Sequence, residues 1–289
     1  METKDLFKKI QRLEIKAKGL TNHIFSGEYH SAFKGRGMTF SEVREYEFGD
    51  EIRTIDWNVT ARYNDPYVKV FEEERELSIL LVIDVSGSSE FGSKVKSKKE
   101  LAIEIAAVLA FSAIANNDKI GAIFLTDHVE KYIAPAKGRK HVLFLLHELI
   151  KFKPVNSSTN LKEGLEFIRN TQKKRSVVFL ISDFISQTEF LRDLQLTKKR
   201  HDAIAIKIND VAESNIPNIG IVQLFNAETG SKTWVDTSSE EVREYLVNSA
   251  KEEEGQLIKK LQKIGVDSIV CQTHEDFVKP LIQLFHKRK

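Results

Sequence analysis

From residue 71 onward, short apolar runs rich in β-branched residues alternate with longer segments of helical periodicity. The apolar runs have the length of strands, and a run without polar residues is typical of a strand buried on both faces. This alternation predicts βαβ units and an α/β fold with a doubly wound, mostly parallel sheet of the Rossmann type. We expect strands at 77–83, 120–126, 129–134, 176–182, 202–208 and 266–271, and helices at 97–116, 139–151, 160–170, 188–198, 239–264 and 275–287.

Two regions depart from the alternation. An insertion near 209–238 holds two strand-like runs joined by Asn-Ala-Glu-Thr-Gly, which predicts a β-hairpin. At the other end of the chain, residues 1–24 have the spacing of an amphipathic helix, and residues 26–65 are rich in glycine and charge, which predicts turns between short extended pieces. We therefore expect an N-terminal region, 1–70, packed on the sheet of an α/β domain formed by 71–289.

Composition excludes several classes of protein. The 289 residues carry a net charge of only +2 with both signs interspersed, so a general nucleic-acid binder is not expected. The single cysteine, Cys271, excludes an internal disulfide and disfavours a cysteine-based zinc site. No segment approaches the run of about 20 apolar residues that spans a bilayer, and the N-terminus lacks the regions of a signal peptide. These features predict a cytoplasmic protein without a membrane span.

A cluster of oxygen-bearing side chains follows the strand expected at 77–83. Asp84, Ser86 and Ser88 alternate within Asp-Val-Ser-Gly-Ser. Because ligands of open parallel sheets bind beyond the carboxyl ends of the strands, these residues are placed where such sheets hold ligands. One carboxylate and two hydroxyls are hard donors that suit Mg²⁺. The alternative for Asp84 and Ser86 is an ordinary capping turn, and this motif alone does not decide between the two.

Two further residues are expected at or near the same edge. Asp183 ends the strand at 176–182, and Thr159 lies in the loop before the helix at 160–170. Taken singly, Thr159 has an alternative as a helix cap and Asp183 as a turn residue. Two carboxylates held close together raise each other's pKa, and a divalent cation between them removes that penalty. The combination predicts a Mg²⁺ site, with Mn²⁺ or Ca²⁺ as alternatives, formed by Asp84, Ser86, Ser88, Thr159 and Asp183.

The sequence does not support catalysis. A haloacid-dehalogenase-like phosphatase needs a second aspartate two residues after the first, and Ser86 stands at that position. Neither Ser86 nor Ser88 lies in a G-x-S-x-G elbow. No phosphate-binding glycine loop follows a strand, and no pair of histidines has the spacing of a metalloprotease. A Mg²⁺-dependent phosphoesterase that uses the same strand-end acids is the alternative.

The D-x-S-x-S motif, a loop threonine and a strand-end aspartate resemble the metal-ion-dependent adhesion site of von Willebrand factor A domains. The resemblance implies that Ser86, Ser88 and Thr159 bind Mg²⁺ directly and that Asp84 and Asp183 act largely through water. It also implies that a carboxylate from a partner protein completes the metal shell.

Two sequence strings in the N-terminal region resemble one particular family. The strings Gly-Glu-Tyr-His-Ser-x-Phe-x-Gly-x-Gly at 27–37 and Gly-Asp-x-Ile-Arg-x-Ile-Asp-Trp-x-x-Thr-Ala-Arg at 49–62 are similar to the domain-of-unknown-function 58 family. Members of that family are bacterial and often encoded beside MoxR-type AAA+ ATPases and other A-domain proteins. The resemblance implies a non-enzymatic, Mg²⁺-dependent adaptor that works with such an ATPase in complex assembly or as a chaperone-like system.

The 49–62 string brings two acids and two bases close together in sequence. Asp50, Arg53, Asp56 and Arg62 predict a salt-bridged turn that fastens this block to the sheet. A partner-facing surface near the metal edge is the alternative.

Overall fold

The computed structural model describes residues 11–15, 38–63, 65–73, 77–92, 96–185, 190–214, 217–225 and 231–288. It divides into two units. One consists of Met1–Ala32 with Ser78–Lys289, and the other of Phe33–Leu77. The prediction that the N-terminal region packs on the sheet stays a prediction, and each unit is described by itself.

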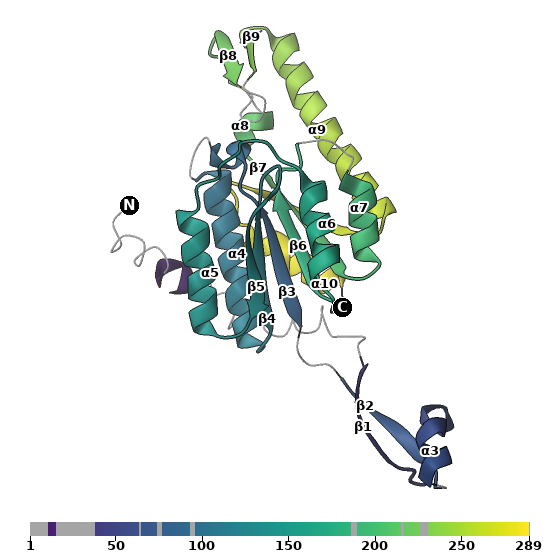
Figure 1. The fold of residues 1–289 in the computed structure, drawn as a ribbon. Helices are drawn as coiled ribbons and strands as arrows, with labels where there is room; N and C mark the ends of the chain where they lie inside the picture. Colours follow the sequence, from purple (N-terminus) through teal and green to yellow (C-terminus); the bar gives the residue numbers. More distant parts are fainter. Residues whose placement is uncertain are drawn as a thin grey trace. The chain divides into compact units, whose positions relative to one another are not determined.

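The larger unit is built on a six-stranded sheet with the order β10-β7-β6-β3-β4-β5 (Figure 1). All neighbouring strands are parallel except β4 and β5, so the antiparallel strand lies at one edge. The predicted α/β fold with a mostly parallel sheet is confirmed. The strands are β3 (Ser78–Asp84), β4 (Lys119–Leu125), β5 (Val129–Ala136), β6 (Val177–Ser182), β7 (Asp202–Asn209) and β10 (Asp267–Gln272).

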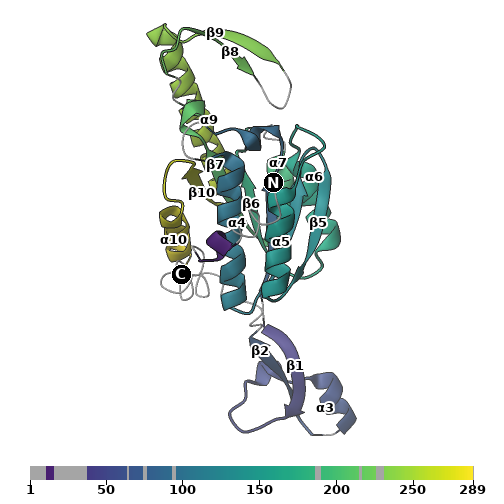
Figure 2. The same cartoon turned by 90° about the vertical axis from the view of Figure 1, so that its left-hand side faces the viewer.

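Helices cover both faces of the sheet (Figures 1 and 2). Alternate residues of the central strands, such as Leu80 and Val82, pack against α6, α7 and the C-terminal half of α9. The other face is covered by α4, α5 and α10. Strands buried on both faces explain the continuous apolar runs in the sequence. The bounds are α4 (Lys98–Ala115), α5 (Arg139–Lys151), α6 (Leu161–Thr171), α7 (Phe190–Lys198), α9 (Glu240–Lys263) and α10 (Val278–Lys287).

The strand order reverses between β3 and β6. From β3 the chain moves outward through β4 to β5, and from β6 it moves the opposite way through β7 to β10. In doubly wound sheets the crevice beyond the carboxyl ends of the strands at such a switch point is the usual ligand site. Asp84 ends β3 and Ser182 ends β6, so the fold places both at this crevice.

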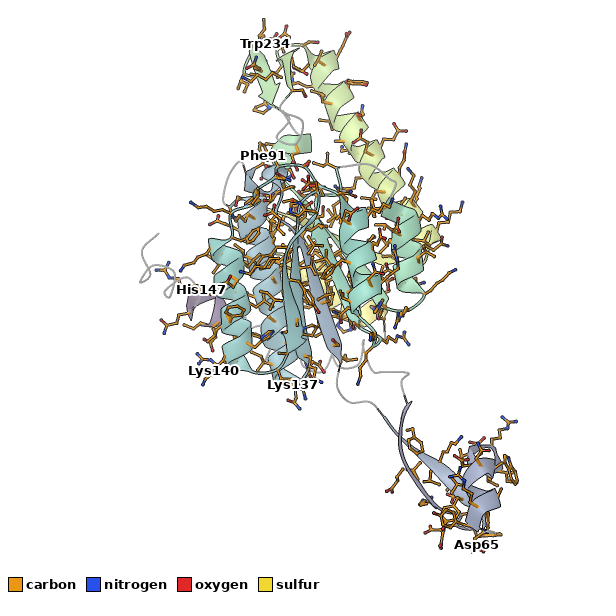
Figure 3. The ribbon with its side chains drawn as sticks, in the orientation of Figure 1. Asp65, Phe91, Lys137, Lys140, His147 and Trp234 are labelled. Carbon is orange, nitrogen blue, oxygen red and sulfur yellow. The ribbon has the colours of Figure 1, made fainter. Side chains whose placement is uncertain are left out.

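The insertion after β7 forms a short helix and a hairpin (Figure 2). The predicted hairpin is present as β8 (Ile221–Phe225) and β9 (Lys232–Asp236), which pair antiparallel. The helix α8 (Val211–Ser214), which the sequence did not predict, packs against α9. Trp234 of β9 projects outward and is 67% exposed (Figure 3).

In the smaller unit, β1 (Met38–Glu45) and β2 (Tyr67–Glu73) form an antiparallel pair. Residues 57–63 were expected among short extended pieces, but Trp57–Tyr63 form the helix α3 after a 3₁₀ turn, Ile52–Thr54. Asp56 explains the difference, because its carboxylate accepts hydrogen bonds from the backbone N–H groups of Asn58 and Val59 and thereby caps the helix.

The acids of the predicted salt-bridged turn pair with other bases than expected, and the expectation that this block is fastened to the sheet stays a prediction. Asp50 accepts two hydrogen bonds from Arg44, and Asp56 pairs with Lys69 at 3.4 Å. The expected bases, Arg53 and Arg62, were therefore the wrong partners for these acids. Both acids organise the unit internally.

Of the predicted helix at 1–24, residues 11–15 are described and are helical. Glu14 is buried and accepts hydrogen bonds from Arg139 of α5. Among the described residues no helix is long and apolar enough to cross a membrane.

Candidate metal centre

Asp84 is the centre of a hydrogen-bond network at the carboxyl end of β3. Its side chain is buried and accepts hydrogen bonds from the Ser182 hydroxyl at 2.7 Å, the Ser86 backbone N–H at 3.0 Å and the Thr159 hydroxyl at 3.3 Å. The bond from Ser86 N–H is the capping turn that was the alternative for this motif. The bonds from Ser182 and Thr159 go beyond a local turn, because they join three separate segments at one carboxylate.

Ser86 and Ser88 lie on the turn that follows β3. Their hydroxyl oxygens are 3.1 Å apart, and Ser86 precedes the 3₁₀ turn Gly87–Glu90 without capping it through its side chain. The Gly87 N–H donates to the Ser157 carbonyl at 2.9 Å, which ties this turn to the loop that carries Thr159. The hydroxyls of Ser86, Ser88 and Thr159 are thus held beside Asp84 by backbone contacts between two loops.

Asp183 follows β6 directly and is also buried. One carboxylate oxygen accepts from the Ile185 N–H at 3.3 Å, and the other accepts from the Lys98 ammonium at 2.6 Å. The next residue, Phe184, has a φ of 53°, so the chain turns sharply away from the end of the strand. Lys207 of β7 donates to the Asp183 carbonyl.

The structure therefore brings together Asp84, Ser86, Ser88 and Thr159, with Asp183 close enough to affect the titration of Asp84. Three residues of this network were missed from sequence. Ser182 had a signal, since it precedes Asp183 at the same strand end. Lys98 and Glu213, which contact each other at 2.5 Å, had none, because they are 115 residues apart.

Burial and the charge of Asp183 raise the pKa of Asp84, although hydrogen bonds from Ser182 and Ser86 oppose the change. Burial alone would lower the pKa of Lys98, but the attraction of Asp183 and Glu213 outweighs it and raises that pKa. Burial lowers the pKa of Lys207, against the opposing effect of Asp183. Asp183 is thus held by the charge of Lys98, whereas Asp84 is held by hydrogen bonds from hydroxyl and backbone N–H groups.

Replacing Asp84 with asparagine is expected to stabilise the metal-free protein. A carboxyl whose pKa is raised on folding contributes stability below its unfolded pKa, and this contribution is lost as the pH rises through the folded pKa. At pH 7 the variant should therefore unfold at a higher urea concentration than the wild type, measured by urea denaturation with EDTA.

Asp127→Asn is the matched control for this prediction. Hydrogen bonds from Asn156 and His128 lower the pKa of Asp127, so the same substitution there should destabilise the protein. A loss of stability in Asp84→Asn at pH 7 would contradict the burial argument.

The donor set fits a small, hard cation. A cavity of about 10 Å³, near the minimum for one water-sized sphere, is lined by Asp84, Ser88, Ser182, Asp183 and Lys98, among others. Among the described residues no three His, Cys, Asp or Glu side chains form a metal cluster. The oxygen atoms present at this site belong to two carboxylates and to serine and threonine hydroxyls. Oxygen donors of this kind suit Mg²⁺ better than they suit softer metal ions.

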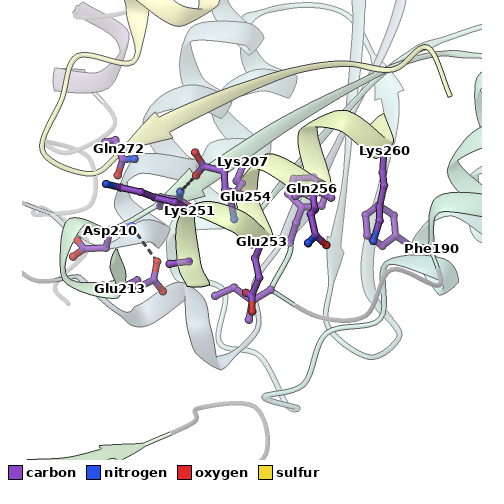
Figure 4. Close-up of a pocket in the computed structure, with 15 residues that line it drawn as sticks. Phe190, Lys207, Asp210, Glu213, Lys251, Glu253, Glu254, Gln256, Lys260 and Gln272 are labelled. Carbon is purple, nitrogen blue, oxygen red and sulfur yellow. Dashed lines mark hydrogen bonds between the residues drawn. The ribbon is translucent and has the colours of Figure 1, made fainter. Parts of the chain in front are cut away.

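A larger cavity of about 520 Å³ lies beside this site (Figure 4). It is bordered by the ends of β7 and β10, by α9 and by Glu213 of α8. The Asp210 N–H donates to Glu213 at 3.1 Å, which holds Glu213 between this cavity and Lys98.

The structure is an α/β protein with a cluster of oxygen-bearing side chains at the switch point of a doubly wound sheet. The family model described as "Protein of unknown function DUF58" matches residues 42–256, and the chain belongs to this family.

The relatives of the chain are uncharacterized. It is 25% identical over 284 residues to Mb1516 of Mycobacterium bovis and to Rv1480 of Mycobacterium tuberculosis, covering 97% of this chain and 89% of each relative. Among solved structures, it is similar to BatB from Bacteroides thetaiotaomicron, with 13% identity, coverage of 73% and 98% and a TM-score of 0.49. The SpRpn10 VWA domain matches with 11% identity, coverage of 73% and 95% and a TM-score of 0.41.

Proposed function

We propose that the protein is a non-enzymatic, Mg²⁺-dependent protein-binding module whose partner presents a carboxylate at the strand-end site. The observation that carries this proposal is that Ser86 and Thr159 contact the buried carboxylate of Asp84, that the Ser88 hydroxyl contacts Ser86, and that Asp84, Ser88 and Asp183 line a small cavity. The sequence resemblance implies a MoxR-type AAA+ ATPase and other A-domain proteins as candidate partners.

The roles of the residues follow from their chemistry. Ser86, Ser88 and Thr159 would offer hydroxyl lone pairs, and Asp84 and Asp183 would hold metal-bound water or bind directly. Bound Mg²⁺ would supply a positive charge with a position open to the partner's carboxylate. The hydroxyls of Ser182 and Thr159 donate to the buried Asp84 carboxylate, and Asp183 is paired with Lys98. In this proposal these contacts hold the site together and do not form a nucleophile with its base.

Mg²⁺ is expected to stabilise the protein. At ten times the dissociation constant the free energy of unfolding should rise by about 1.4 kcal/mol, seen as a higher melting temperature in a thermal-shift titration. Thr159→Ala should lose most of this gain. Ser157→Ala is the matched control, because Ser157 is exposed and the contact it makes to Gly87 uses its backbone carbonyl.

Partner binding gives the second readout. Co-precipitation with a MoxR-type ATPase from the same organism should require Mg²⁺ and should be lost in Asp84→Ala and Ser86→Ala. Binding that survives both substitutions would overturn the metal-mediated mechanism. If the protein hydrolyses a phosphoester such as p-nitrophenyl phosphate and this activity depends on Asp84, the phosphoesterase function would be favoured over the adaptor function.

A further inference from the structure

Lys98 is an unusual residue for its position. It is the first residue of α4, its side chain is 3% exposed, and its ammonium lies 2.6 Å from Asp183 and 2.5 Å from Glu213. A helix N-terminus carries partial positive charge, so a cation there is disfavoured, and burial adds a further penalty. The attraction of the two carboxylates offsets both penalties.

The position of Lys98 bears directly on the proposed cation. Lys98 lines the 10 Å³ cavity together with Asp84 and Asp183. A divalent ion in that cavity would lie beside the ammonium, and the two positive charges would compete for Asp183. Because the site is buried, their repulsion would be screened far less than on the surface.

Glu213 offers the ammonium a second acceptor. It contacts Lys98 from α8, on the side of the larger cavity, and its other oxygen is held by the Asp210 N–H. Lys98 can therefore release Asp183 and keep one carboxylate partner, without moving into solvent. The ammonium of Lys98 balances the charge of Asp183, and Glu213 would remain its partner if a cation bound Asp183.

We infer that Lys98 is an internal counter-ion that competes with the divalent cation for Asp183 and thereby sets the metal affinity of the site. This inference rests on the proposed function, since it concerns the same metal. Glu213 acts as a positioning residue, which receives the ammonium when Asp183 turns to the metal. The site would thus fold without metal and fill only at a cation concentration set by this competition.

Isothermal titration with Mg²⁺ tests the inference. Lys98→Met removes the competing charge and should tighten the dissociation constant by about tenfold or more, the effect of one nearby like charge. Lys96→Met is the matched control. Lys96 is two residues away and pairs with Glu104 at 3.0 Å, so its removal changes the charge equally without freeing Asp183. It should change the dissociation constant less than about threefold.

Glu213→Gln should change the Mg²⁺ affinity in the opposite direction. This variant keeps the inference testable if Lys98→Met does not fold. With only Asp183 as a charged partner, Lys98 should hold that carboxylate more firmly, and Mg²⁺ should bind more weakly than to the wild type. Equal Mg²⁺ affinities in the wild type, Lys98→Met and Glu213→Gln would overturn the inference that Lys98 competes with the cation, while leaving the proposed function intact. Absence of binding in all three folded proteins would overturn the proposed function and the inference with it.

Discussion

Asp183→Ala is expected to lower the free energy of unfolding of the metal-free protein by about 3 to 5 kcal/mol, the usual cost of removing one partner of a buried ion pair. The substitution leaves the ammonium of Lys98 buried with Glu213 as its remaining charged partner. It also removes the carboxylate that accepts the Ile185 N–H where the chain leaves β6. Urea denaturation in EDTA measures the effect, with an unchanged m-value as the sign that only stability has changed.

Two variants give this prediction its controls. Asp267 is 33% exposed and lies 2.9 Å from Arg288, which also pairs with Asp202. Asp267→Ala should therefore lower the free energy of unfolding by at most about 1 kcal/mol. The double variant Lys98→Met, Asp183→Leu replaces the buried pair by apolar side chains and should recover most of the lost stability. A loss of less than 1 kcal/mol in Asp183→Ala would show that Glu213 alone neutralises Lys98.

Gly121→Ala is expected to destabilise the protein by about 3 kcal/mol, the upper part of the range for overpacked sites. A Cβ at Gly121 would lie 2.5 Å from the Ile133 carbonyl oxygen and 2.7 Å from the Pro135 nitrogen. These are backbone atoms of the edge strand β5, at the point where its register with β4 shifts between Ile120 and Ala122. The strand would have to move away, and its hydrogen bonds to β4 would weaken.

The same substitution at Gly255 is the matched control. Gly255 lies within α9, and a Cβ there would meet nothing within 4 Å. Alanine should therefore stabilise the protein by about 0.5 to 1 kcal/mol, because it restricts the unfolded chain and favours the helix. Opposite signs at the two glycines, read by urea denaturation, are the expected result. A loss below 1 kcal/mol at Gly121 would mean that β5 shifts at little cost.

Local pattern was sufficient for most elements of the larger unit. The run at 77–83 became β3, displaced by one residue, because its apolar residues are buried on both faces. The helices α3 and α8 were missed for a different reason. Both are short, with seven and four residues, so neither has an apolar stripe long enough to show helical periodicity. Asp56 caps α3, but a capping aspartate in a glycine-rich segment looks the same as a turn aspartate.

The site likewise contains residues that the sequence indicates and residues that only the structure identifies. Asp84, Ser86, Ser88, Thr159 and Asp183 could be proposed from sequence, because residue types at strand ends and in one loop carry the signal. Their common hydrogen-bond network, and the part that Ser182 plays in it, required the order of the strands. Lys98 looked like one more residue in a lysine-rich segment, Lys-Ser-Lys-Lys, where solvent exposure is the usual expectation.

The sequence by itself determined the α/β class, the hairpin insertion and the set of oxygen donors, because hydrophobic periodicity and residue chemistry are local properties of the chain. Only the tertiary structure decided that β3 and β6 are neighbours at the switch point and that Lys98, Asp183 and Glu213 form one buried charge cluster. Contacts across 85 and 115 residues depend on which strands pair and which helix ends face them. Which charged side chains meet at the site therefore follows from the fold.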